Sequence, residues 1–198
     1  RLVVPALGAL LFSPSPASAA SPAPALAPQA RDFLGHGQEY ARHQQWQAAI
    51  ELYKNALDIN PRLADAHFLL GVAYHQQNRL GRAVAALRKA GELNPRSART
   101  FYNLGVAYAN TGETEKEIAA YRRALRLDPE HISAHYNLAT AYWSQGRDGL
   151  ACGKLFQAGR LYKRAGNRHQ AREMLHLIQR IAPDSSYQQR LTQALREE

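Results

Sequence analysis

The sequence predicts an all-α fold in which helical hairpins stack side by side as an α-solenoid, and two observations predict it. The first is a spacing of 34 residues that separates Tyr40, Tyr74, Tyr108 and Tyr142, and also Pro61, Pro95 and Pro129. The second is that the apolar residues between these markers recur at helical spacing, in two stripes per period. One hairpin cannot bury both of its faces, so a chain of such hairpins must stack.

The copy of the pattern over 98–131 shows why each period contains two helices. Its first stripe is Phe101, Leu104, Gly105 and Tyr108, and its second is Ile118, Tyr121, Ala124 and Leu125. We expect Thr111-Gly112 to end the first helix. Asp128-Pro129 should end the second, because proline lacks an N–H and clashes with the preceding turn.

Together these residues resemble the tetratricopeptide repeat (TPR), whose first helix carries aromatic-x2-Leu-Gly-x2-Tyr and whose second carries Ala-x3-aromatic-x2-Ala-x4-Pro. The matching residues are Phe33, Gly37, Tyr40, Ala49, Tyr53, Ala56 and Pro61 in the first copy, Leu70, Gly71, Tyr74, Ala83, Leu87, Ala90 and Pro95 in the second, and Leu138, Ala139, Tyr142, Ala151, Leu155 and Ala158 in the fourth. The fourth copy has Lys163 in place of the closing proline. The resemblance covers about 30–185 and implies a right-handed α-solenoid whose first helices line a concave groove for peptides or partner helices.

Three glycines inside the first helices, Gly37, Gly71 and Gly105, need a physical reason. A glycine in a helix costs roughly 0.5–1 kcal/mol relative to alanine. We expect the compensation to be close approach of the second helix, which would bring small residues such as Ala49 and Ala83 against the glycines.

The N-terminal segment differs in composition from the repeats. Arg1 precedes an apolar run from Leu2 to Phe12, and Ala17-Ser18-Ala19 follows. A basic start, a short apolar core and an A-x-A site predict a secretory signal peptide over 1–19 and export to a periplasm or an equivalent compartment. An uncleaved anchor, the one expected route to membrane contact, and a transit peptide are the alternatives. The Ala- and Pro-rich segment 20–29 should be an extended linker.

After the linker we expect four repeats over 30–63, 64–97, 98–131 and 132–165, the second helix of a partial fifth repeat over 166–183, and a capping helix over 184–198. The helices are expected at about 30–44, 47–59, 64–77, 80–93, 98–110, 114–127, 132–145, 148–165 and 168–181. Asn60, Asn94 and Asp128 mark the turns between repeats. Thr114 and Glu117 predict a capping box at the helix start, with a functional buried carboxylate as the alternative for Glu117.

The helix over 148–165 has two expected roles. An offset copy of the pattern starts 20 residues after the fourth repeat begins, and it places Leu155, Gly159, Tyr162 and Pro183 on repeat positions. The helix therefore ends the fourth repeat and also stands in for the first helix of a fifth. The last helix has a single apolar stripe of Tyr187, Leu191 and Leu195, which suits the end of a solenoid.

The composition gives no support for an enzyme. The chain of 198 residues has a formal net charge of +9, and its single cysteine, Cys152, excludes a C-x-x-C motif. It contains no phosphate loop, no HExxH and no G-x-S-x-G. His131 and His135 have a spacing that suits a metal ion, but His67 and His135 occupy the large aromatic position of their repeats, which favours packing. We expect no catalytic residue, no cofactor and no metal.

The first helices supply the candidate binding residues, carried over from the positions that face the groove in TPR proteins. They are Phe68, His75, Arg99, Tyr102, Asn103, Asn110, Tyr136, Asn137, Trp143, Phe156, Gln157, Arg160 and Lys163. The resemblance implies an aromatic ladder of Phe68, Tyr102, Tyr136 and Phe156, and a short amide ladder of Asn103, Asn137 and Gln157. Amide side chains can pair with the backbone of an extended peptide. The alternative is that the aromatic rings pack repeat against repeat and the asparagines bond neighbouring backbone.

The sequence therefore predicts a non-catalytic scaffold or assembly factor. Its aromatic and basic groove favours a protein or peptide partner with acidic residues. The clamp by which chaperone-binding relatives hold a terminal carboxylate is not matched, because Leu34 and Gln38 stand at its lysine and asparagine positions.

Two alternative functions remain open. The stretch 147–180 has eight basic and two acidic residues, which could attract nucleic acid or an anionic membrane surface. Export argues against nucleic acid. The chain could also self-assemble through exposed repeat ends.

Overall fold

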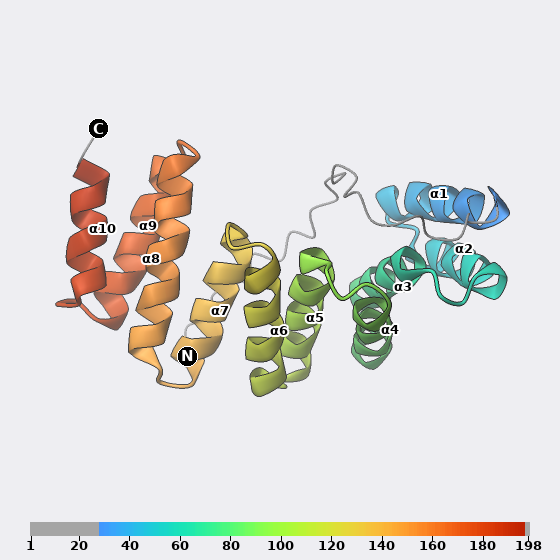
Figure 1. Cartoon of the computed structure of the whole chain (residues 1–198), viewed down its shortest axis with the longest axis horizontal. Coiled ribbons are helices and arrows are strands. Elements are labelled where there is room, and N and C mark those ends of the chain that lie inside the picture. The colour runs from blue at the N-terminus through green and yellow to red at the C-terminus, as the bar shows by residue number, and fades with distance from the viewer. Residues whose placement is uncertain (1–27, 197–198) are drawn as a thin grey trace. The chain divides into compact units, whose positions relative to one another are not determined.

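A computed structural model describes residues 28–196 of the chain. These residues form ten helices and no strand (Figure 1). The helices are α1 (Pro28–Arg42), α2 (Trp46–Ile59), α3 (Ala64–Gln76), α4 (Leu80–Leu93), α5 (Ala98–Thr111), α6 (Thr114–Leu127), α7 (Ile132–Ser144), α8 (Asp148–Arg164), α9 (Arg168–Ile181) and α10 (Ser186–Arg196). They divide into two compact units, one ending at Thr111 and one beginning at Gly112. The predicted signal peptide over 1–19 lies outside the described residues.

The predicted helices are confirmed, and their ends differ from the prediction by two residues at most. The clearest shift is in α1, which begins at Pro28, inside the segment predicted as linker. Proline is favoured at the first helical position because its fixed φ suits a helix and its missing N–H is not needed there. Ala30 is fully buried in a cluster with Ala56, Leu63 and Ala66, so the start of α1 belongs to the core.

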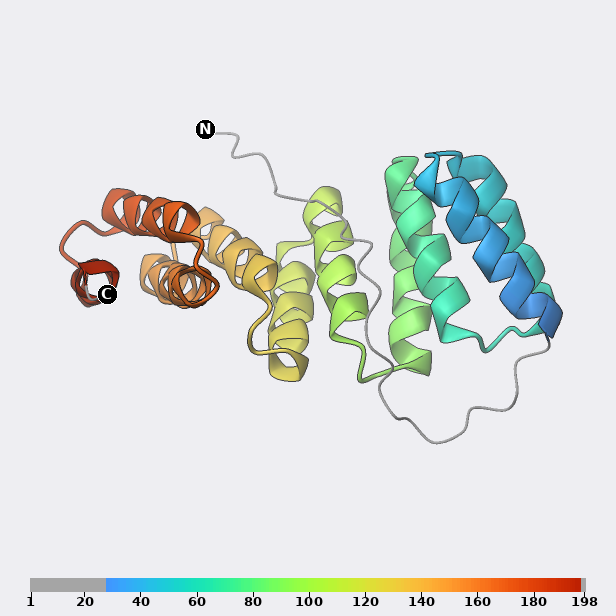
Figure 2. The same ribbon diagram turned by 90° about the horizontal axis from the view of Figure 1, so that it is seen from above.

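In the unit that ends at Thr111, α1 pairs with α2 and α3 pairs with α4, while α5 packs against α4 (Figure 2). The residues from Phe68 to Tyr74 are all buried, because α3 has neighbours on several sides. Its sequence is accordingly apolar around most of its circumference. By contrast, α1 buries only Ala30, Gly37 and Ala41.

In the unit that begins at Gly112, α6 packs against α7, α7 against α8, and α8 against both α9 and α10 (Figure 1). Its buried core includes Cys152, Phe156, Met174, Ile178 and Leu191. Leu191 is the contribution of α10 and is fully buried. The last helix thus covers α8 and α9 with its apolar stripe, as expected of a capping helix.

The turns between first and second helices require a residue with positive φ. In the four successive turns these residues and their φ angles are Gln44 (58°), Asn78 (57°), Gly112 (74°) and Gly146 (67°). The following N–H donates to a tyrosine carbonyl at 2.9 Å, from Gln45 to Tyr40, from Arg79 to Tyr74 and from Arg147 to Tyr142. This is the Schellman arrangement, which satisfies carbonyls left without partners at a helix end.

The turns between repeats use a different device. The side-chain oxygens of Asn60, Asn94 and Asp128 accept hydrogen bonds from the N–H two residues further on. The distances are 3.1 Å to Arg62, 3.3 Å to Arg96 and 3.1 Å to Glu130. These Asx turns confirm the predicted role of the three residues before proline.

Close approach of paired helices is confirmed at Gly37 and Gly71, but the nearest neighbour is not the predicted alanine. A Cβ atom at Gly37 would lie 2.5 Å from Cε1 of Tyr53, and one at Gly71 would lie 2.6 Å from Cγ of Leu87. Tyr53 and Leu87 stand one helical turn beyond Ala49 and Ala83, and each is 1% exposed. The glycines therefore leave space for large, buried side chains of the paired helix.

The predicted capping box at the start of α6 is wrong. The helix begins at Thr114, so Glu113 is the N-cap residue, and no side chain caps this end. The N–H of Glu117 donates to the carbonyl of Glu113 at 2.9 Å, which is the bond that a Thr114 cap would have supplied. Glu117 is partly buried, and this burial raises its pKa to about 7.

Candidate peptide-binding surface

In the unit that ends at Thr111, two predicted groove aromatics are buried. Phe68 of α3 is 7% exposed and Tyr102 of α5 is 6% exposed. The guanidinium carbon of Arg99, from α5, lies 3.9 Å from the centroid of the Phe68 ring, a cation–π distance. Phe68 therefore does not form an open floor, and it supports an arginine that belongs to the next helix.

Arg99 is exposed as a whole, although its head group rests on the ring. Burial lowers the pKa of Arg99 from its ordinary value, and the charge of Asp65 opposes that shift. A guanidinium held by one face keeps its N–H edges available, and those edges match a carboxylate.

His75 and Asn110 join α3 to α5 within the same unit. Nδ2 of Asn110 lies 2.6 Å from Nε2 of His75. Burial lowers the pKa of His75, which favours the neutral ring, so the amide donates to Nε2 and the ring proton is on Nδ1. That nitrogen is buried and has no hydrogen-bond partner within the described residues.

The two asparagines of the predicted amide ladder are buried, 7% exposed for Asn103 and 8% for Asn137. Nδ2 of Asn103 donates to the Arg99 carbonyl in its own helix at 2.9 Å. Nδ2 of Asn137 donates to the Tyr121 hydroxyl at 3.3 Å. Both amides are thus used within the protein, which corrects the expectation that they offer themselves to a peptide.

In the unit that begins at Gly112, the last member of the aromatic ladder is covered by α10. Phe156 is 4% exposed, with the Tyr187 ring at a centroid distance of 5.9 Å. The guanidinium carbons of Arg190 and Arg160 lie 4.8 and 5.8 Å from the Phe156 centroid. Of the four predicted ladder aromatics only Tyr136 is partly exposed, so a continuous aromatic floor is wrong.

The other predicted groove residues of this unit divide into two groups. Trp143 is partly exposed and Arg160 is exposed. Nζ of Lys163, by contrast, donates to the Ala194 carbonyl of α10 at 2.5 Å, and Gln157 lines a pocket formed by α6, α7 and α8. The sequence missed Arg190, because α10 was assigned to capping alone.

The basic stretch over 147–180 is partly neutralised by its surroundings. Arg147 pairs with Glu115 at 3.3 Å, and Arg164 pairs with Glu130. Exposed pairs of this kind contribute little to stability, about 0–1 kcal/mol, but they reduce the positive charge that a polyanion would meet. This counts against the nucleic-acid and membrane alternative.

The repeated histidines hold inter-repeat turns. Nε2 of His67 lies 2.9 Å from the Pro61 carbonyl, and Nε2 of His135 lies 2.9 Å from the Pro129 carbonyl. This supports packing as the reason for both residues. Within the described part of the chain, no three histidine, cysteine or acidic side chains group as metal ligands would.

The sequence did not predict one feature of the structure, a pocket lined by basic side chains. Between α6, α7 and α8 the structure has a pocket of about 440 Å³ that is lined by Arg122, Arg126 and Lys154, with Pro129, His135 and Gln157. Its residues come from three helices and the turn after α6 and form no motif, so only the folded arrangement brings them together.

Comparison with protein families agrees with this architecture. Models described as TPR repeat match residues 37–78, 73–112 and 111–146, and one described as tetratricopeptide repeat matches 155–185. The chain belongs to the tetratricopeptide repeat family, and its fold is an all-α TPR solenoid.

Solved structures with a similar fold include that of MamA protein, at 23% identity and a TM-score of 0.64, over 77% of this chain and 91% of that one. YrrB, described as a TPR protein with an unusual peptide-binding site, has 19% identity and a TM-score of 0.61 over 83% and 92%. The first TPR of Spaghetti (RPAP3), bound to the HSP90 peptide SRMEEVD, has 20% identity and a TM-score of 0.59 over 60% and 94%. At these identities the likeness shows the fold alone. A comparison with curated proteins gave no match.

The helices were also compared with the requirements of a membrane span. Among residues 28–196, none combines the length and the apolar character that crossing a bilayer demands.

Proposed function

We propose that this chain is a non-catalytic protein-interaction scaffold that binds an acidic peptide or helix of another protein along its first helices. The observation that carries the proposal is Arg99, held at 3.9 Å over the Phe68 ring in an exposed position. The other unit repeats the arrangement, with Arg190 at 4.8 Å from the Phe156 ring. Two of the similar TPR structures are described with a peptide or a peptide site, and the peptide SRMEEVD contains three acidic residues.

A rigid, exposed guanidinium is well suited to binding a carboxylate. An arginine that is already stacked loses less side-chain entropy when it forms a paired hydrogen bond. His75 and Asn110 lie on the same two helices, α3 and α5, and their mutual bond of 2.6 Å fixes them as neighbouring polar groups. The contact surface is therefore made of positioned polar side chains, with the aromatic rings beneath them.

The test begins with peptides selected from a random library on the full chain. Affinities are then measured by fluorescence anisotropy for wild type, Arg99→Ala and Arg88→Ala, the last being an exposed arginine of α4. We expect acidic peptides to be selected, and Arg99→Ala to weaken their binding about tenfold or more, since charge-assisted bonds contribute about 1.5–3 kcal/mol. Arg88→Ala should bind like wild type.

Arg99→Lys refines the test, because it keeps the charge and loses the planar fork. An intermediate affinity supports a paired carboxylate. Equal affinities for all variants, or selection of peptides without acidic residues, would refute the acidic partner. Melting temperatures of the variants by circular dichroism separate lost binding from lost folding.

We also propose that the chain is exported, on the composition of 1–19. Residues 1–30 fused to alkaline phosphatase should give an active enzyme, which needs an oxidising compartment for its disulfides. Leu10→Arg interrupts the apolar run and should abolish that activity. An inactive native fusion, or one unaffected by Leu10→Arg, would reject export.

A further inference from the structure

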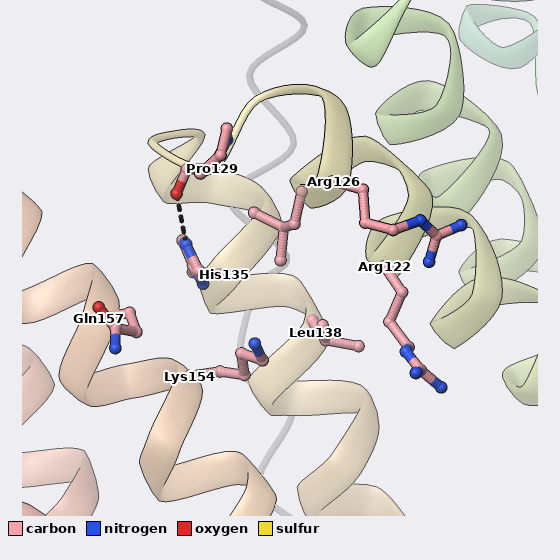
Figure 3. Close-up of a pocket in the computed structure, with 8 residues that line it drawn as sticks. Arg122, Arg126, Pro129, His135, Leu138, Lys154 and Gln157 are labelled. Carbon is pink, nitrogen blue, oxygen red and sulfur yellow. Dashed lines mark hydrogen bonds between the residues drawn. The ribbon is translucent and has the colours of Figure 1, made fainter. Parts of the chain in front are cut away.

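The pocket between α6, α7 and α8 contains positive charge with no matching carboxylate. Arg122 and Arg126 come from α6 and Lys154 from α8, and no acidic side chain of the described residues lines the pocket. Figure 3 shows Lys154 directed toward α7, near His135 and Leu138, while the arginine side chains extend from α6. In this view the two guanidinium groups lie apart from Lys154, so the three charges do not meet at a single point.

Of these three cations, Lys154 has the least favourable environment for its charge. It is partly buried, and no hydrogen bond or ion pair to it is found within the described residues. Burial lowers the pKa of Lys154, and the positive charge of Arg122 lowers it further. A charge that costs stability and lacks a partner is a reasonable indicator of a binding site.

The inner wall of the pocket provides a second observation. His135 is 7% exposed, and its Nδ1 is buried without a hydrogen-bond partner. Its Nε2 is held at 2.9 Å from the Pro129 carbonyl, which fixes the ring (Figure 3). Besides Lys154, the charges of His131 and Asp128 act on this ring. A buried polar group without a partner normally costs about 1–3 kcal/mol.

We propose that this pocket binds a ligand with at least two oxyanion groups, of carboxylate or phosphate type, one at Lys154 and the others along Arg122 and Arg126. The volume of about 440 Å³ is within the range of small-ligand pockets, roughly 300–1,000 Å³. Gln157 adds an amide that can donate to the same ligand. The three cations of the site belong to α6 and α8, so the proposal does not depend on Arg99 and Phe68, which carry the proposed peptide surface.

The experiment measures the melting temperature of the full chain against increasing pyrophosphate, citrate or a Glu-rich peptide, with ionic strength held constant by sodium chloride. Constant ionic strength separates binding from general screening, and a ligand that binds the folded state raises the melting temperature. The variants are Lys154→Met, Arg122→Ala with Arg126→Ala, and Arg172→Ala, the last being an exposed basic residue of α9.

We expect the wild type to be stabilised by at least one probe, with the apparent affinity reduced about tenfold or more in Lys154→Met and in the arginine pair. Arg172→Ala should match the wild type. Without ligand, Lys154→Met should melt at a higher temperature than the wild type, because it removes a partly buried charge beside Arg122. Opposite signs for stability and binding distinguish a binding lysine from a structural one.

The probes also identify the source of the oxyanions. Stabilisation by pyrophosphate or citrate supports a free small anion, and stabilisation by the peptide alone supports acidic side chains of a partner. Chemical-shift changes of the His135 ring locate the ligand in this pocket. The proposal is overturned if no probe raises the melting temperature up to about 10 mM, well above a millimolar dissociation constant, or if Arg172→Ala loses as much affinity as Lys154→Met.

Discussion

Glu117 shows how one residue can oppose the stability of the repeat that contains it. It stands where TPR proteins usually carry a small residue, and burial raises its pKa from 4.5 to about 7. The folded chain therefore holds the proton more tightly than the unfolded chain does. Relative to high pH, the free energy of unfolding is therefore greatest below about pH 4.5, where Glu117 is protonated in both states. This advantage is lost as the pH rises through 7.

Glu117→Gln should remove this pH dependence. Above pH 8 the variant should be more stable than the wild type by about 1–2 kcal/mol, because each pKa unit corresponds to about 1.4 kcal/mol and solvent screening reduces the effect at a partly exposed group. The difference should shrink steadily between pH 7 and pH 4.5. Urea unfolding at several pH values measures it, with exposed Glu173→Gln as the control. A difference that stays constant with pH would show that Glu117 ionises normally.

The packing of paired helices depends on a few points of close approach. Two glycines of α1 allow this to be tested, because only one of them lies close to α2. Gly35 and Gly37 belong to the same helix, but a Cβ at Gly35 meets no atom within 4 Å, while one at Gly37 lies 2.5 Å from the buried ring of Tyr53. The same substitution two residues apart therefore has opposite expected effects.

Gly37→Ala should lower the free energy of unfolding by about 1–3 kcal/mol, the usual cost of overpacking a core. Gly35→Ala should raise it by roughly 0.5–1 kcal/mol, through helix propensity. Thermal and urea unfolding of both variants test the pair. Similar effects of the two substitutions would mean that contact with Tyr53 does not explain the glycine.

Elements whose cause is local were predictable from the sequence. The prolines after Asn60, Asn94 and Asp128 predicted the repeat boundaries. The helical spacing of the apolar residues predicted which face of each helix is buried. The range of α6 was predicted correctly, but its N-cap residue was not, since Thr114 and Glu117 also fit the pattern of a capping box. Sequence alone did not decide between a cap and the first helical turn.

At the scale of the whole molecule, the repeated sequence pattern was enough to predict the fold. It predicted the candidate site only in part. Family positions indicate which side of a first helix a residue occupies, but they do not say what the following helix places over it. Arg99 covers Phe68, and α10 covers Phe156. The pocket at Lys154 was not predictable for the same reason, since it depends on three helices meeting.

The double role of α8 limits how this protein can have grown in evolution. A block of 34 residues upstream of α7 could be copied and inserted with each new hairpin complete in itself. The fourth repeat and the partial fifth repeat share α8. A duplication whose boundary falls inside α8 would separate these two repeats and leave each without a complete helix to pack against. Lengthened or shortened descendants of this gene should therefore differ toward the amino-terminal side, while the segment from α7 to α10 is inherited as a single block.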